Sequence, residues 1–311
     1  LIASGRAITM QALGGTGALK IGADLLKQLV PDAKVAISNP SWENHRALFE
    51  RAGFDVVNYP YYDAASHGLD LKGMLDFLRA LPRQSVVVLH ACCHNPTGVD
   101  PTPAQWREIA TVMQQCDLIP FLDIAYQGFG EGLEADAAAV RLFAELDMTM
   151  LISSSFSKSF SLYGERVGAL TIVTGSKDES SRVLSQIKRV IRTNYSNPPT
   201  HGGTVVAAVL NSPELFGLWD AELAGMRERI RLMRRQLVEK LKAAGVNRDF
   251  SFVMEQRGMF SYSGLTAKQV DRLRDEHGIY AVSTGRICVA ALNSGNIDGV
   301  VKAIGQVMQE D

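Results

Sequence analysis

Residues 85–124 read SVVVLHACCHNPTGVDPTPAQWREIATVMQQCDLIPFLDI. Two short apolar runs rich in β-branched residues, 85–91 and 119–124, flank an amphipathic stretch over 103–115. A buried strand, a helix and a second buried strand form the repeating unit of a parallel sheet. This region therefore predicts an α/β fold.

The same alternation extends in both directions along the chain. Further strands are expected at residues 34–38, 148–153 and 167–173. Further helices are expected at residues 16–30, 42–52, 69–80 and 135–145. We therefore predict a large domain over residues 1–225, with a mostly parallel central sheet.

A second, smaller α+β domain is predicted over residues 226–311. A long amphipathic helix at about 213–244 connects the two domains. Strands are expected at 250–254, 259–263 and 287–291, and helices at 266–277 and 296–308.

The composition of the chain argues against several classes of function. The chain has 311 residues, 46% hydrophobic and 21% charged, which is typical of a folded globular protein. Its 32 basic and 33 acidic residues give a net charge of −1, so no global field favours nucleic acid or an anionic membrane. The four cysteines form no C-x-x-C pair, and no signal-peptide layout or membrane span is found. These features predict a soluble cytoplasmic protein without nucleic-acid or membrane partners.

Polar side chains follow the predicted strands. In an open α/β sheet, ligands bind beyond the carboxyl ends of the strands, so these residues should share one site. They provide a glycine turn before a helix, an aromatic ring, an acid, a phenol and a lysine. The set is Gly15, Thr16, Trp42, His45, Asn95, Asp123, Tyr126, Ser155, Ser157 and Lys158.

Two other chemistries fit residues of this region or near it. Ser155 and Lys158 match the S-x-x-K motif of serine acyl-transferases, and Tyr195-Ser196-Asn197 imitates a second motif, but a K-T-G element is missing. His90, Cys92, Cys93 and His94 could bind a metal. Adjacent cysteines inside a strand would point to opposite faces, which disfavours a metal site.

Residues 155–168, SFSKSFSLYGERVG, resemble the lysine signature of class I pyridoxal-phosphate aminotransferases. The motifs SNPSW (38–42), HNPTG (94–98), DIAYQG (123–128) and NYSNPP (194–199) extend the resemblance to the aspartate and aromatic amino acid enzymes. Residues 120–130 and 256–280 resemble bacterial aromatic (tyrosine) aminotransferases more closely. The resemblance implies the type I fold of PLP-dependent transferases.

The resemblance also implies a role for each residue around pyridoxal 5′-phosphate. Lys158 would form the imine with the cofactor and move the proton, Asp123 would face the pyridine nitrogen, and His45 would support Asp123. Tyr126 and Asn95 would bind the phenolic oxygen, and Trp42 would stack on the ring. The phosphate would be bound by Gly15, Thr16, Ser155, Ser157 and Arg166.

For the substrate, the resemblance implies that Arg286 binds the α-carboxylate, beside Asn95 and Trp42. Arg192 would reach a dicarboxylate side chain across the interface of a homodimer with a shared active site. The expected reaction moves amino groups of aromatic and dicarboxylic amino acids to 2-oxoglutarate or oxaloacetate. A strict aspartate aminotransferase is the alternative. Relatives are expected to continue before Leu1, and an inactive chain lacking that segment is the other alternative.

Overall fold

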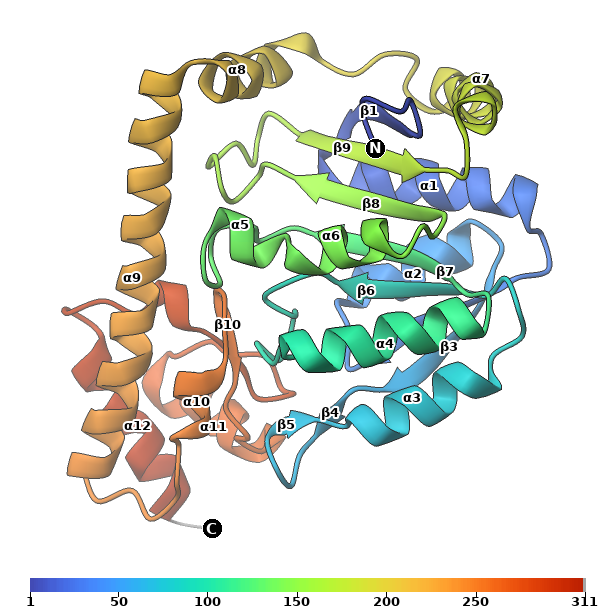
Figure 1. Cartoon of the computed structure of the whole chain (residues 1–311). Helices are drawn as coiled ribbons and strands as arrows, with labels where there is room; N and C mark the ends of the chain where they lie inside the picture. Colours follow the sequence, from blue (N-terminus) through green and yellow to red (C-terminus); the bar gives the residue numbers. More distant parts are fainter. Residues whose placement is uncertain (310–311) are drawn as a thin grey trace.

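The computed structural model describes residues 1–309 and contains a seven-stranded sheet between two layers of helices (Figure 1). The strands run in the order β1-β9-β8-β7-β6-β2-β3. Strand β9 runs antiparallel to the other six strands of this sheet, so the sheet is mostly parallel, as predicted. The strands are β1 (Ala7–Leu13), β2 (Lys34–Asn39), β3 (Asp55–Pro60), β6 (Val86–His90), β7 (Ile119–Ile124), β8 (Met150–Ser155) and β9 (Val167–Val173).

Strand β6 shows why the sheet is covered on both faces. Val86 and Val88 pack in one hydrophobic cluster, whereas Val87 and Leu89 pack in the other, because successive side chains of a strand point to opposite faces. The first cluster includes side chains of α1 (Gly14–Leu29), α2 (Glu43–Arg51) and α7 (Lys177–Asn194). The second includes side chains of α3 (Leu71–Ala80), α4 (Pro103–Gln115) and α6 (Ala138–Glu145).

Helix α4 has the bounds that the sequence predicted. Thr102 Oγ1 accepts a hydrogen bond from the Gln105 backbone N–H, and the Gln105 side chain accepts one from the Thr102 N–H. This capping box satisfies two amides that the first turn leaves unpaired, and Pro103 has no N–H to satisfy. Local sequence therefore sets where this helix begins.

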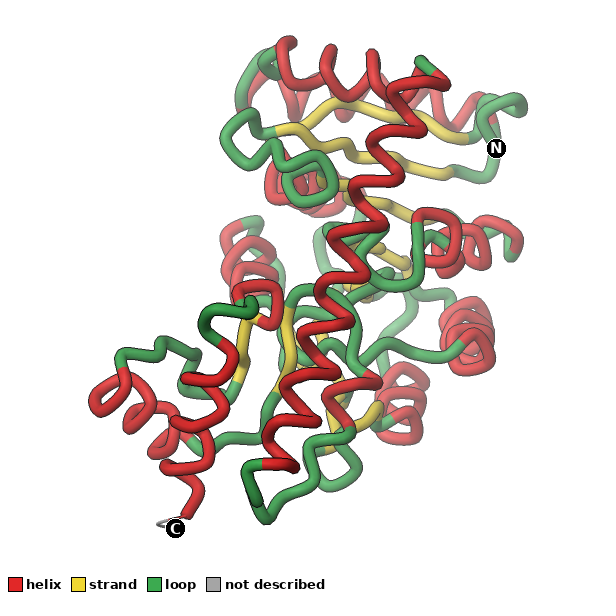
Figure 2. Tube along the Cα trace, turned by 90° about the vertical axis from the view of Figure 1, so that its left-hand side faces the viewer, coloured by secondary structure: helices red, strands yellow, loops and turns green. Residues whose placement is uncertain are grey.

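The long helix α9 (Pro213–Ala243) runs from the sheet to the C-terminal part of the chain (Figure 2). It begins where Ser212 Oγ accepts the Leu215 N–H, and its buried stripe includes Leu223, Ile230 and Leu237. Packed near its far end are α10 (Phe252–Glu255), β10 (Phe260–Tyr262), α11 (Ala267–His277), β11 (Arg286–Cys288) and α12 (Ile297–Gln309). The division into domains at 225/226 stays a prediction, and residues 310 and 311 of it lie outside the described chain.

Three predicted elements differ from the structure. The strand predicted at 250–254 is wrong: residues Phe252–Glu255 form the short helix α10, and the burial of Phe250, just before it, and of Val253 does not follow the alternation of a strand. The helix predicted at 135–145 breaks into α5 (Leu133–Asp136) and α6. The strand predicted at 287–291 is β11 followed by a 3₁₀ turn at Val289–Ala291.

Several elements were not predicted at all. They include β1 and β3 at the two edges of the sheet, the short β4 (Tyr62–Asp63) and β5 (Gly68–Leu69), and helices α7 and α8 (Thr200–Asn211). An edge strand such as β1 is only partly buried, so it lacks the continuous apolar run of a central strand.

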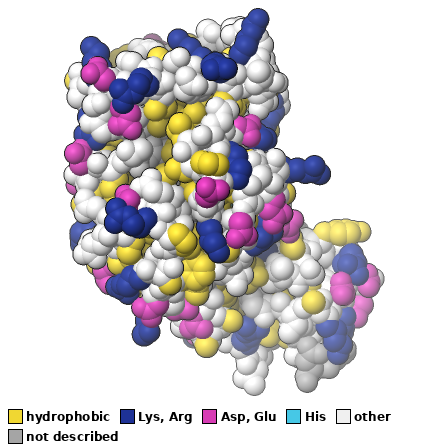
Figure 3. Space-filling view, turned by 90° about the vertical axis from the view of Figure 1, so that its right-hand side faces the viewer, with side chains coloured by type: hydrophobic (Ala, Val, Ile, Leu, Met, Phe, Trp, Pro, Cys, Tyr) yellow, Lys and Arg dark blue, Asp and Glu magenta, His cyan; other side chains and the backbone are white. Residues whose placement is uncertain are grey.

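The surface carries both signs of charge. Lys and Arg side chains are interspersed with Asp and Glu side chains over the face in Figure 3. None of the helices within residues 1–309 combines the length and the apolar character that a membrane crossing requires.

Candidate active site

The predicted site residues meet in a cavity of about 190 Å³ beyond the carboxyl ends of the parallel strands. Ten of the thirteen residues predicted to bind or catalyse line this cavity. They are Gly15, Thr16, Trp42, Asn95, Asp123, Tyr126, Ser155, Ser157, Lys158 and Arg166. The other three are His45, which lies behind the cavity wall, Arg286, which contacts Asn95, and Arg192, which lies elsewhere.

Asp123, at the end of β7, is fixed by a histidine from α2. Its Oδ2 lies 2.9 Å from Nε2 of the fully buried His45, whose Nδ1 lies 3.0 Å from Ser41 Oγ. Burial alone would raise the pKa of Asp123, but the hydrogen bond and charge of His45, with weaker contributions from His90 and Lys158, leave this pKa below its usual value. The carboxylate is therefore ionised, and its buried Oδ1 has no hydrogen-bond partner among the described residues.

Lys158, in the loop after β8, lines the same cavity. Its Nζ lies 4.5 Å from the ring centroid of Tyr126. Burial, with a smaller contribution from the charge of Arg166, lowers the pKa of the Lys158 amine, although Asp123 opposes this shift. A lysine with a lowered pKa is more readily deprotonated, so it can act as a nucleophile or a base.

An anion cradle lies at the N-terminus of α1. Gly14 has a φ of +67°, and a Cβ built there would lie 2.6 Å from Nη2 of Arg166. A Cβ at Gly15 would lie 3.1 Å from the Ser155 Cβ, so the glycines let the helix terminus approach both side chains. Amides at a helix N-terminus, serine hydroxyls and a guanidinium together suit a phosphate.

Arg286 and Tyr126 are linked through Asn95. Arg286 Nη1 donates to Asn95 Oδ1 at 3.1 Å, and Asn95 Nδ2 lies 3.5 Å from the Tyr126 hydroxyl. The Arg286 guanidinium also lies 4.8 Å from the Phe260 ring centroid. Burial raises the pKa of Tyr126, so its hydroxyl keeps its proton and can donate a hydrogen bond.

Sequence reasoning missed two polar residues that line the cavity, His90 and Tyr163. The sequence suggests His90 only as a metal ligand, but it is the last residue of β6, and this position at a strand end is the signal that could have identified it. Burial, with the nearby His94 and His45, lowers the pKa of His90 well below its usual value. Neither ring nitrogen has a hydrogen-bond partner among the described residues.

Arg192 lies on α7, outside the lining of this cavity. Its Nη1 donates to Ser196 Oγ at 2.6 Å, and the side chain is exposed. The prediction assigned Arg192 to the site of a partner subunit, and one chain does not test it.

The family model for aminotransferases of class I and II matches residues 2–304, almost the whole chain. The chain belongs to this family. The type I fold predicted from the lysine signature is confirmed by solved structures of the same family.

Relatives of this aminotransferase are named for two substrate classes. An aspartate aminotransferase of Pseudomonas aeruginosa is 68% identical over 308 residues, which cover 99% of this chain and 77% of the relative. An aromatic-amino-acid aminotransferase of Escherichia coli is 52% identical, over 97% of this chain and 76% of the relative. The crystal structure of an aromatic-amino-acid aminotransferase from Burkholderia pseudomallei, covalently bound to pyridoxal phosphate, is 69% identical with a TM-score of 0.98. The match covers 99% of this chain and 77% of that one.

The geometry weakens both competing chemistries for this aminotransferase. Ser196 of the second acyl-transferase motif bonds to Arg192 and does not line the cavity. Cys92 and Cys93 do not lie in a strand, so the predicted orientation of their side chains toward opposite faces is wrong. They follow β6, Cys93 has a φ of +52°, and both thiols lie near Asp136. The Asp136 oxygens already accept three backbone N–H groups, which leaves the carboxylate poorly available to a metal.

Proposed function

We propose that this aminotransferase binds pyridoxal 5′-phosphate and moves amino groups from amino acids to 2-oxo acids by a ping-pong mechanism. One observation carries the proposal: a lysine with a lowered pKa and the unpartnered oxygen of a buried, ionised aspartate line the same cavity. The name of the related Burkholderia pseudomallei structure, covalently bound to pyridoxal phosphate, supports the same cofactor.

The residues present fit this group. Asp123 Oδ1 is a buried acceptor without a partner, and a protonated pyridine nitrogen would satisfy it. The cradle of Gly15, Thr16, Ser155, Ser157 and Arg166 suits the phosphate. Tyr126 and Asn95 offer donors for the phenolic oxygen, and Trp42 offers a flat ring for stacking.

When bound, pyridoxal phosphate supplies an aldehyde and an electron sink for the substrate α-carbon. Lys158 is the group that takes the α-proton and returns it, because its amine is partly deprotonated and lines the cavity. The ionised carboxylate of Asp123, which His45 holds in place, stabilises a positive charge that lies next to it. Arg286 offers the planar fork that binds a carboxylate with two hydrogen bonds.

The proposed donors are aromatic and dicarboxylic amino acids, with 2-oxoglutarate or oxaloacetate as acceptors. The names of the relatives include both aspartate and aromatic-amino-acid aminotransferases, which supports a dual specificity. Arg286 would bind the carboxylate that all these substrates share. Arg192 from a partner subunit would meet the second carboxylate of a dicarboxylic substrate. A strict aspartate aminotransferase is the alternative.

A cytoplasmic homodimer with a shared active site is part of the proposal. Large apolar side chains on α8 and at the start of α9 are exposed in the single chain, and a second copy would cover them. They are Leu210, Leu215, Phe216 and Leu218.

The test uses the visible absorbance of the protein supplied with pyridoxal phosphate. The expected result is a visible band that changes when aspartate or tyrosine is added and returns when 2-oxoglutarate follows. A visible band that does not change when either amino acid is added, or the absence of a visible band, would contradict the proposal. Absorbance that responds to aspartate but not to tyrosine or phenylalanine would select the strict aspartate enzyme.

A further inference from the structure

Asn95 and Tyr126 are carried by two separate loops. Asn95 lies in the loop after β6 and Tyr126 in the loop after β7. Their side chains are 3.5 Å apart, at the outer limit of a hydrogen bond, so neither is firmly held by the other. Their relative position therefore depends on what fixes the two loops.

The Asn95 loop is fixed by Asp100 and by the turn at residues 256–258. Asp100 accepts the backbone N–H of Cys93 at 2.7 Å and that of His94 at 2.8 Å. The Gly98 carbonyl accepts the Arg257 N–H at 2.7 Å. A Cβ at Gly258 would lie 2.5 Å from the Cys93 Cβ, so this turn packs directly on the loop.

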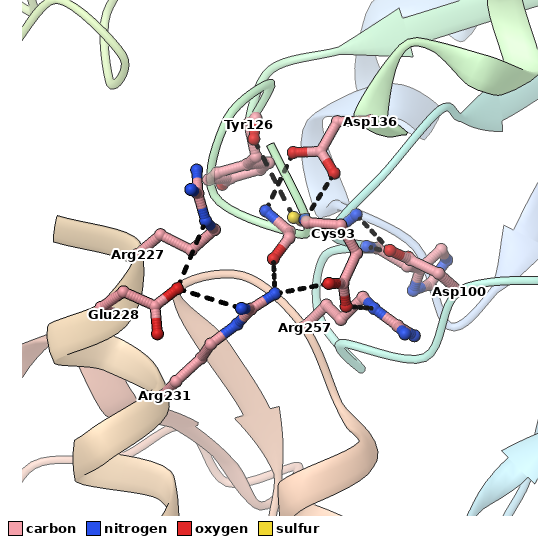
Figure 4. A network of polar contacts seen from close by, with 11 residues as sticks. Cys93, Asp100, Tyr126, Asp136, Arg227, Glu228, Arg231 and Arg257 are labelled. Carbon is pink, nitrogen blue, oxygen red and sulfur yellow. Dashed lines mark hydrogen bonds and ion pairs between the residues drawn. The ribbon is translucent and has the colours of Figure 1, made fainter. Parts of the chain in front are cut away.

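The Tyr126 loop is fixed by Asp136 and by two arginines of α9. Asp136 accepts the N–H groups of Gly128, Gly130 and Glu131. Arg227 Nη1 donates to the Gly128 carbonyl, and Arg231 Nη2 donates to the Gly130 carbonyl, each at 2.8 Å. Figure 4 shows these arginines reaching from the helix toward the loop.

Glu131 joins the two sets of contacts. Its Oε1 accepts a hydrogen bond from Arg257 Nε at 2.8 Å, and its Oε2 accepts one from Arg231 Nη2 at 2.6 Å. Arg257 belongs to the turn that packs on the Asn95 loop, whereas Arg231 belongs to the helix that holds the Tyr126 loop (Figure 4). Glu131 is the carboxylate that bridges these two arginines.

We propose that Glu131 is a positioning residue, which sets the distance between Asn95 and Tyr126 by holding Arg257 and Arg231 together. This inference rests on the proposed function, because the pair matters through the phenolic oxygen that it would bind. A small displacement of the Tyr126 hydroxyl or of the Asn95 amide would change the hydrogen bonds offered to that oxygen, and with them the absorbance of the bound group.

The bridge should act on position more than on stability. The Glu131 side chain is 48% exposed, so water screens its interaction with both arginines. Partial burial opposes ionisation, but the hydrogen bond from Arg257 and the charge of Arg231 outweigh it and keep the pKa of Glu131 below its usual value. The bridge therefore stays charged at neutral pH.

Amide hydrogen exchange of the full chain, without and with pyridoxal phosphate, tests the link between the loops. Glu131→Gln should speed exchange at residues 93–98, with little change in the midpoint of thermal unfolding, because the hydrogen bonds of Glu131 reach this loop only through Arg257. Arg257→Gln should have a similar effect. In the double variant, exchange at residues 93–98 should be no faster than in the more affected single variant, because both substitutions break the same bridge.

In the loaded protein, Glu131→Gln should shift the pH midpoint of the visible absorbance and lower kcat/KM by roughly 2- to 30-fold. Glu134→Gln is the matched control, since Glu134 lies in the same region and its exposed side chain forms an ion pair with Arg141. If Glu131→Gln matches Glu134→Gln in exchange and in pH midpoint, the inference is overturned while the proposed function stands. A wild-type chain without a responsive visible band overturns both.

Discussion

His45 Nε2 and Asp123 Oδ2 lie 2.9 Å apart, in two side chains almost completely sealed from water. The pair comes from α2 and the end of β7, 78 residues apart in the chain. Because His45 occupies one carboxylate oxygen, the other oxygen of Asp123 is left for a ligand.

Asp123→Asn should slow the chemical step more than it weakens substrate binding. An amide carries no charge, so a protonated ring nitrogen would lose its stabilisation, and we expect single-turnover rates to fall by roughly 10²- to 10³-fold. Stopped-flow absorbance after addition of aspartate measures the rate, and its concentration dependence gives the substrate affinity. Near-normal rates would contradict the role of Asp123.

Lys158→Ala should retain the cofactor but abolish proton transfer. The cradle around Arg166 is untouched by this change, so bound pyridoxal phosphate should still be detected after gel filtration. Borohydride reduction followed by peptide mass mapping should place the label on Lys158 in the wild type and on no lysine in the variant. If the label in the wild type were found on another lysine, that lysine and not Lys158 would be the residue that binds the cofactor.

Arg192→Ala and Arg286→Lys should separate the two carboxylate contacts. Without Arg192, a dicarboxylate would bury a charge that faces no cation, at a cost of several kcal/mol, whereas an aromatic side chain gains by burial alone. We expect a steep fall of kcat/KM for aspartate and a small one for tyrosine. Arg286→Lys should lower kcat/KM for both aspartate and tyrosine, since a lysine does not offer the planar pair of donors that binds a carboxylate with two hydrogen bonds. Equal losses in Arg192→Ala would indicate a structural role.

Asp100 should make the folded chain less stable as pH rises from about 4 to about 6. Burial raises the pKa of Asp100 to about 6, although the N–H groups of His94 and Cys93 oppose the shift. An unfolded aspartate titrates near 3.9, so between these values the folded state binds more protons. The loss of stability caused by ionising Asp100 is absent below the pKa of the unfolded state and complete above the pKa of the folded state.

Urea unfolding at pH 4, 5, 6 and 7 measures this effect. Relative to Asp100→Asn, which does not titrate, the wild type should lose about 1–3 kcal/mol of unfolding free energy between pH 4 and 7. Parallel curves for the two proteins would show that the carboxyl titrates normally.

The central strands, the helices between them and the family could be predicted from the sequence alone. Strands such as β6 are recognisable because a strand buried on both faces must be apolar throughout, and α4 because its cap lies within a few residues of its first turn. The lysine signature at 155–168 and the polar residues after each strand are local features too, so ten residues of the cavity could be predicted from the sequence, although His90 and Tyr163 could not.

The way in which those residues meet depends on contacts between distant parts of the chain. The contact of Arg286 with Asn95 joins positions 191 residues apart, and no local pattern encodes such a distance. The same holds for the unpartnered oxygen of Asp123 and for the bridge from Glu131 to Arg231 and Arg257. Packing also overrode the local pattern at residues 250–254, which predicts a strand: Phe250 and Val253 are buried without alternation, and residues 252–255 form a helix. Propensity acts between near neighbours, whereas burial and partners are set by elements that fold together from distant parts of the chain.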